Sequence, residues 1–174
     1  ALSVSLAADQ AELKAGRKAT WTLTLTNSGA GHMLPTGDPD RYLEAEFEVV
    51  DARGRVVSAR RTTMSRWILW WPVIYEYDDT RIPPFESRDL AFSYAVPRRD
   101  EGLTLHVRVS YHILTERAYR RLQEKYGLTV EVPHVFTLYE EQMPLREGTV
   151  QRQAAARPTS PRCAPEQTHE DETG

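Results

Sequence analysis

Alternation of apolar and polar residues with a period of two recurs along this chain and limits its possible folds more than any other feature. Successive side chains of an extended strand point to opposite faces, so this alternation is typical of a strand with one buried face. The segments that show it are 2–8, 18–27, 42–51, 90–96 and 103–113. Polar turn-forming residues separate them, and their repetition predicts an all-β protein with antiparallel strands.

The clearest local motif is a β-hairpin built on the segment at 42–51. The turn sequence Asp51-Ala52-Arg53-Gly54 ends this segment, and residues 55–60 can return antiparallel beside it. One face of the first arm is apolar and the other is acidic. We therefore expect a buried set and a solvated set, which are respectively Leu43, Ala45, Phe47 and Val49, and Glu44, Glu46 and Glu48.

One segment has the signature of a helix. Thr115 is a suitable N-cap, Gly127 is a suitable C-terminal stop, and the residues between them are good helix formers. We expect a short helical insertion between strands over 115–126, with an inward face made of Ala118, Leu122, Tyr119 and Tyr126. Residues 128–132 and 134–141 can then supply a last extended segment or pair.

Together these elements predict an antiparallel two-sheet sandwich of immunoglobulin-like character, with one short helical insertion. The predicted sandwich domain spans residues 1–145. Residues 146–174 contain almost nothing to bury and predict a polar tail, extended or disordered when alone. This tail carries Cys163.

Composition excludes several functional classes. Lysine plus arginine number 22 and aspartate plus glutamate 25, a net charge of −3, so no nucleic-acid surface is expected. The longest apolar run, 67–75, is too short for a transmembrane segment and contains a proline. Cys163 is the single cysteine, which excludes an intrachain disulfide, a Cys-x-x-Cys zinc pair and the Cys-x-x-Cys-His sequence that attaches haem covalently.

The loop at 27–41 holds the main candidate site residue. It contains Gly29, Gly31, Pro35 and Gly37, a combination that predicts a shaped loop, and His32 stands at its centre. A histidine on such a scaffold is a candidate ligand or proton-transfer group. The alternative is that His32 only hydrogen-bonds to the backbone of the loop.

Two blocks of sequence, with the hairpin turn, resemble a known family. They are Thr26-Asn27-x-Gly29-Ala30-Gly31-His32-x-x-Pro35-Thr36-Gly37, and Asp79-Thr80-Arg81-Ile82-Pro83-Pro84 followed by Ser87-Arg88-Asp89-Leu90-Ala91-Phe92. The chain resembles, over roughly residues 2–145, the β-sandwich domain that follows the haem-binding region in many bacterial multihaem c-type cytochromes. Two departures are the absence of any Cys-x-x-Cys-His and the presence of Phe85 where the family has a glycine.

The resemblance implies a periplasmic or extracellular location and participation in an electron-transfer assembly. It also favours a role for His32 as a ligand. Because this chain cannot attach haem itself, the resemblance leaves open whether it is a detached accessory subunit or a fragment of a longer cytochrome.

Three functional hypotheses follow. The first is a non-catalytic assembly module that docks on a c-type cytochrome chain or domain, with His32 as a distal ligand to the partner's haem c iron. The second is a copper site formed by His32, Met33 and Met64, or by His106 and His112; these last two are six residues apart, about 20 Å along a strand. The third is a generic interaction domain whose contact surface is the aromatic cluster within 67–77, namely Trp67, Trp70, Trp71 and Tyr75.

An enzyme is not expected, since the sequence lacks a Gly-x-Ser-x-Gly motif and a phosphate-binding loop.

Overall fold

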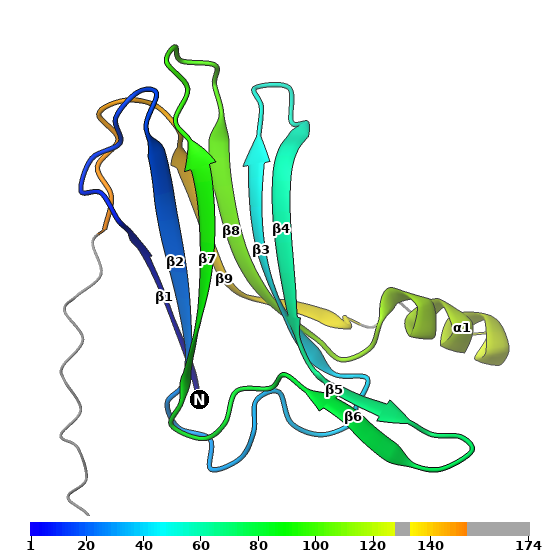
Figure 1. Cartoon of the computed structure of the whole chain (residues 1–174). Coiled ribbons are helices and arrows are strands. Elements are labelled where there is room, and N and C mark those ends of the chain that lie inside the picture. The colour runs from blue at the N-terminus through cyan, green and yellow to red at the C-terminus, as the bar shows by residue number, and fades with distance from the viewer. Residues whose placement is uncertain (128–132, 153–174) are drawn as a thin grey trace, which may run out of the picture.

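Two antiparallel sheets face each other in the computed structural model, which describes residues 1–127 and 133–152 (Figure 1). The three-stranded sheet has the order β1-β2-β7, and the four-stranded sheet has the order β4-β3-β8-β9. The bounds are β1 Leu2–Ala8, β2 Lys18–Asn27, β3 Tyr42–Val50, β4 Val56–Met64, β7 Ser87–Ala95, β8 Thr104–His112 and β9 Val135–Pro144. The prediction of an all-β, immunoglobulin-like sandwich is confirmed.

The core lies between the sheets because β2, β3, β7 and β8 turn their apolar faces inward. In β2 every second residue is buried, and the opposite face of the strand is half-buried. Phe47 of β3 stacks on Phe92 of β7, with ring centroids 5.2 Å apart, so the aromatic residues join the two sheets directly. Burial of this apolar face is the main source of stability for the sandwich.

The predicted hairpin is present as β3 and β4, and the apolar set of β3 is buried as expected. The expectation that Glu46 is solvated is wrong, because this side chain is only 3% exposed. β3 is a central strand, and the register places Arg61 of β4 and Arg108 of β8 directly opposite Glu46. Both arginines hydrogen-bond to the Glu46 carboxylate and cover it.

A two-stranded hairpin and a helix project from the sandwich (Figure 1). The hairpin consists of β5 Arg66–Leu69 and β6 Tyr75–Asp79, and it contains the aromatic cluster within 67–77. We call residues 66–79 the aromatic arm. The helix, α1 Glu116–Tyr126, is inserted between β8 and β9, as the sequence predicts.

The ends of α1 are those expected from the sequence. The Thr115 side chain accepts a hydrogen bond from the Ala118 backbone N–H, and Gly127 adopts the left-handed conformation with φ 59°. The expected inward face is wrong, because no residue of α1 is buried. The residues next to the helix ends determine its caps, whereas contact between the helix and the core depends on the position of the helix in the folded chain.

Residues 146–152 lie against the three-stranded sheet, beyond the boundary placed at 145. The Ala8 N–H donates to the Arg152 carbonyl at 2.8 Å, and the indole N–H of Trp21 donates to the Gln151 side chain at 3.0 Å. Residues 128–132, and the rest of the predicted tail with Cys163, lie outside the described residues. Over the ranges that are described, no helix is long and apolar enough to cross a membrane.

Candidate functional site

The loop that carries His32 connects β2 of one sheet to β3 of the other, and Asn27 at the end of β2 determines its path. The Asn27 side chain is fully buried. Its amide donates to the carbonyls of His32 at 2.8 Å and Ile82 at 3.2 Å, and its oxygen accepts from the Ala30 N–H at 3.1 Å. One side chain thus holds both the first turn of the loop and the segment that follows the aromatic arm.

Backbone pairing fixes the second part of the same loop. Leu34 and Ile82 exchange two hydrogen bonds of 2.9 and 2.7 Å. Among the glycines expected to shape the loop, Gly37 has a positive φ of 96°, whereas Gly29 and Gly31 do not. The loop is therefore braced mainly by Asn27 and by the Leu34–Ile82 pairing, and less by glycine than we expected.

The segment after Ile82 also contains the departure from the family pattern. Phe85 has a φ of 61°, in the left-handed region where glycine is the residue with the least strain. Its N–H nevertheless donates to the Asn27 carbonyl at 2.9 Å, and its ring is exposed. The turn expected at this position forms despite the substitution.

His32 is exposed, and one ring nitrogen is held by its own loop. Nδ1 lies 3.1 Å from the Met33 carbonyl oxygen. A carbonyl can only accept, so Nδ1–H is the donor, and in the neutral imidazole Nε2 is the nitrogen with the lone pair. This arrangement orients the imidazole and presents Nε2 as a ligand atom.

The structure does not assemble the copper sites considered from the sequence. Met64 is completely buried in the core, whereas His32 is exposed, so these two side chains do not share a surface site. His106 and His112 are both half-buried on β8. Across the described residues, no group of three or more His, Cys, Asp or Glu side chains is arranged to hold a metal ion.

The aromatic arm is exposed along most of its length. Trp67, Trp70 and Trp71 are 47%, 62% and 81% exposed, and Tyr75 is also exposed. Within the arm, Trp67 and Tyr77 contact each other at a tilted angle with centroids 6.3 Å apart. The aromatic cluster is thus a surface feature and not a second core.

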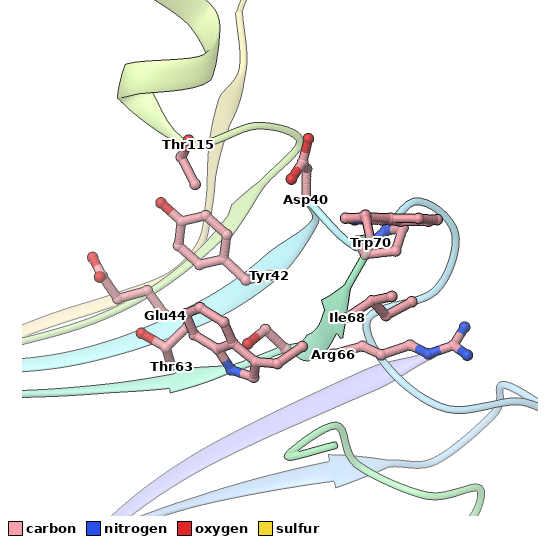
Figure 2. A pocket seen from close by; sticks show the side chains of 11 residues that line it. Asp40, Tyr42, Glu44, Thr63, Arg66, Ile68, Trp70 and Thr115 are labelled. Atoms are coloured by element: carbon pink, nitrogen blue, oxygen red, sulfur yellow. The ribbon is translucent and has the colours of Figure 1, made fainter. Parts of the chain in front are cut away.

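A cleft of about 310 Å³ lies where the arm, the His32 loop and the start of α1 meet (Figure 2). We call it the aromatic cleft. Its walls include Tyr42 at the start of β3 and Trp67 and Trp70 of the arm, and Asp40, Glu44 and Ser65 contribute its polar groups. The loop that presents His32 therefore also forms one wall of this cleft.

Burial and stacking control the charge beside the cleft. The ring of His112 stacks on Tyr42 with centroids 4.2 Å apart, and its Nε2 lies 4.0 Å from a Glu44 oxygen. Burial is the main influence on the pKa of His112 and lowers it below the usual 6.5, despite the opposing charge of Glu44. His112 is consequently neutral at pH 7 and does not offset the Glu44 carboxylate.

Sequence reasoning identified His32 and the tryptophans but missed the polar half of the cleft. Asp40, Glu44 and Ser65 come from three different segments, and no local motif connects them. The only local signal of a binding surface here was the cluster of three tryptophans in the arm.

No protein-family model matches this chain, and no curated protein matches it. Among solved structures, the chain is similar to a penta-heme cytochrome c552 from Thermochromatium tepidum, with a TM-score of 0.59 and 20% sequence identity. The similarity covers 82% of this chain and 39% of the cytochrome, so the chain spans well under half the length of that protein. At this level of identity the likeness establishes a shared fold.

Proposed function

We propose that this chain is a non-catalytic docking module of a multihaem c-type cytochrome system, and that His32 supplies a distal axial ligand to one haem iron of the partner. The partner is a c-type cytochrome chain or domain located in the periplasm or outside the cell. The chain itself attaches no haem covalently, since its sequence contains a single cysteine.

The observation that carries this proposal is the hydrogen bond from His32 Nδ1 to the Met33 carbonyl, at 3.1 Å. Histidine ligands of metals typically donate their second ring N–H to a carbonyl or carboxylate, which fixes the tautomer and makes the ligating nitrogen more basic. His32 has this arrangement and is exposed.

The bracing of the loop supports the same role. A ligand on a slack loop would lose conformational entropy on binding, and the partner interaction would have to offset that loss. Here Asn27 and the Leu34–Ile82 pairing hold the backbone on both sides of His32. Most of the ordering is complete before a partner arrives.

The shared fold adds weaker support. One protein of similar structure is a penta-heme cytochrome, and the match covers 39% of it. A sandwich of this kind is therefore compatible with a place beside haem groups, either as a domain of a longer cytochrome or as a separate subunit.

A second candidate function is a general protein-interaction domain that uses the aromatic arm. Trp67, Trp70, Trp71 and Tyr75 are all exposed, and tryptophan and tyrosine are favoured at binding hot spots. This role is compatible with the first, because the arm and the His32 loop adjoin through Asp40.

A haem c peptide with one histidine ligand and an open sixth coordination position tests the ligand role. Mixing it with the unaltered chain should convert the iron to a low-spin, bis-histidine absorption spectrum. His32→Ala should abolish this conversion without changing the unfolding midpoint, because the His32 ring has no packing role in the core.

His169→Ala is the matched control, since it removes another histidine, one that belongs to the polar tail predicted from the sequence after residue 145. If His169→Ala abolishes the spectral change and His32→Ala does not, the assignment of His32 as ligand is wrong. In an assembly with the cytochrome partner, His32→Ala should change the spectrum and midpoint potential of one haem only.

A further inference from the structure

We propose that the aromatic cleft binds an organic cation, namely an alkylammonium or guanidinium group. This inference is independent of the ligand role of His32. The cleft volume of about 310 Å³ is at the small end of ligand sites. It suits a single side chain or a small amine.

Three aromatic side chains line the cleft and can attract a cation. Tyr42, Trp67 and Trp70 line the cleft from two directions, since Tyr42 begins β3 and the two tryptophans belong to the arm. A cation above the face of such a ring is attracted by the ring quadrupole, and tryptophan gives the strongest attraction. Figure 2 shows Tyr42 and Trp70 on opposite sides of the cleft.

Two carboxylates also favour a cation in the cleft. Asp40 and Glu44 both line the cleft, and within residues 1–127 and 133–152 neither carboxylate forms an ion pair with a lysine or arginine. Arg66 also lines the cleft, but its guanidinium donates to Glu76 and points away from Tyr42 and Glu44 (Figure 2). The two carboxylates outnumber the single cation among the lining residues, so the lining of the cleft carries net negative charge.

A buried hydroxyl without a hydrogen-bond partner is a third feature of the cleft, independent of the rings and the carboxylates. Ser65 lines the cleft, is only 5% exposed, and its Oγ has no hydrogen-bond partner within the described structure. Its backbone is fixed by Thr80, which bonds both the Ser65 N–H and carbonyl at 3.0 and 2.9 Å. Buried hydroxyls in native proteins are normally paired. An N–H donor from a bound cation would provide the partner.

These three features select a cation over other ligands. An anion would be repelled by Asp40 and Glu44. A purely apolar ligand would cover these carboxylates without neutralising them and would leave the Ser65 hydroxyl unpaired, both of which are unfavourable. An ammonium or guanidinium group can interact with the ring faces, pair with the carboxylates and donate a hydrogen bond to the Ser65 hydroxyl at the same time.

Two probes of nearly equal size test the inference, n-butylammonium and 1-butanol. With the full chain, n-butylammonium should shift the indole N–H resonances of Trp67 and Trp70, while those of Trp71 and Trp21 stay in place. Its affinity should exceed that of 1-butanol by at least about fivefold, from ring and carboxylate attraction combined. Raising the salt concentration should weaken it.

Variants locate the binding. Asp40→Asn with Glu44→Gln should lower the affinity for n-butylammonium severalfold, toward that for 1-butanol, and Trp70→Ala should also weaken it severalfold. Trp71→Ala is the control for the arm, since Trp71 does not line the cleft. Equal affinity for the two probes, or unchanged affinity in the Asp40 and Glu44 variant, would overturn the proposal.

The source of the cation is resolved by a third probe, lysine blocked at both its amino and carboxyl groups. Binding at least as tight as that of n-butylammonium indicates a lysine side chain of a partner protein, and weaker binding indicates a free amine. His32→Ala should leave all of these affinities unchanged, so failure here and failure of the haem-ligand role can be distinguished.

Discussion

At the scale of single residues, Glu46 shows what a local pattern can and cannot predict. Alternation places it correctly on the outer face of β3. Its burial follows from cross-strand register, which puts Arg61 and Arg108 on either side, and these partners lie 15 and 62 residues away in sequence. No pattern within one strand contains that information.

This buried carboxylate gives a prediction about pH. Burial is the largest single influence on the pKa of Glu46 and raises it, but the hydrogen bonds and charges of Arg61 and Arg108 together lower it below the usual 4.5. A carboxyl with a depressed pKa in the folded protein stabilises the fold above its unfolded pKa. That contribution is lost as the pH falls through the folded pKa.

We therefore expect Glu46→Gln to lower the free energy of unfolding at pH 7 by about 1 to 2 kcal/mol, as the charged hydrogen bonds are replaced by neutral ones. Urea denaturation at a series of pH values should show the gap between the two proteins closing below pH 4.5. Glu101→Gln, at an exposed position, should have no such effect. A gap that stays constant down to pH 2.5 would mean that the Glu46 charge does not stabilise the fold.

The site itself was partly predictable at this scale. His32 was identified because its loop is rich in glycine and proline, and those residue types are visible locally. The role of Asn27 was not, because its amide joins backbone carbonyls 5 and 55 residues away, and only the folded chain brings them together.

At the scale of elements, the sequence predicted the alternating strands and the helix, but not how the aromatic arm and α1 are placed. β2, β3, β7 and β8 alternate because burial of one face selects apolar residues at every second position. The aromatic arm and α1 have no buried face of this kind, so periodicity says little about their placement. The helix was still located, because Thr115 and Gly127 act within one turn of its ends.

The contrast between Trp21 and Trp71 gives a prediction for the arm. Trp21 of β2 is fully buried, whereas Trp71 is 81% exposed. Trp21→Ala should lower the free energy of unfolding by about 3 to 5 kcal/mol, through lost burial and the cavity that remains. Trp71→Ala should change it by less than about 0.5 kcal/mol, as expected for a surface substitution.

Denaturant unfolding followed by circular dichroism measures both effects without depending on tryptophan emission. Tyr75→Ala is a second exposed position in the arm and should behave like Trp71→Ala. A loss of several kcal/mol in Trp71→Ala would show that the arm packs on the sandwich and is not a free surface.

At the scale of the whole molecule, the chain keeps contact with the sandwich beyond the predicted boundary at residue 145. Residues 146–152 contain no apolar run, which is why the boundary was placed at 145. Backbone hydrogen bonds hold this stretch in place. Leu13 N–H donates to the Thr149 carbonyl at 3.0 Å, and Gln151 N–H donates to the Ala11 carbonyl at 2.8 Å.

Shortening the chain tests where the fold ends. A chain that stops at residue 145 loses these bonds and leaves the buried indole N–H of Trp21 without its Gln151 partner, at 3.0 Å in the intact protein. We expect it to be less stable than a chain that stops at residue 152 by about 1 to 3 kcal/mol, because it loses these hydrogen bonds and uncovers the Trp21 ring. Gln151→Ala in the longer chain should show the part of this loss that belongs to the indole alone. Equal urea midpoints for the two lengths would place the end of the fold at residue 145, whereas a difference would show that the segment after β9 completes the three-stranded sheet by covering Trp21.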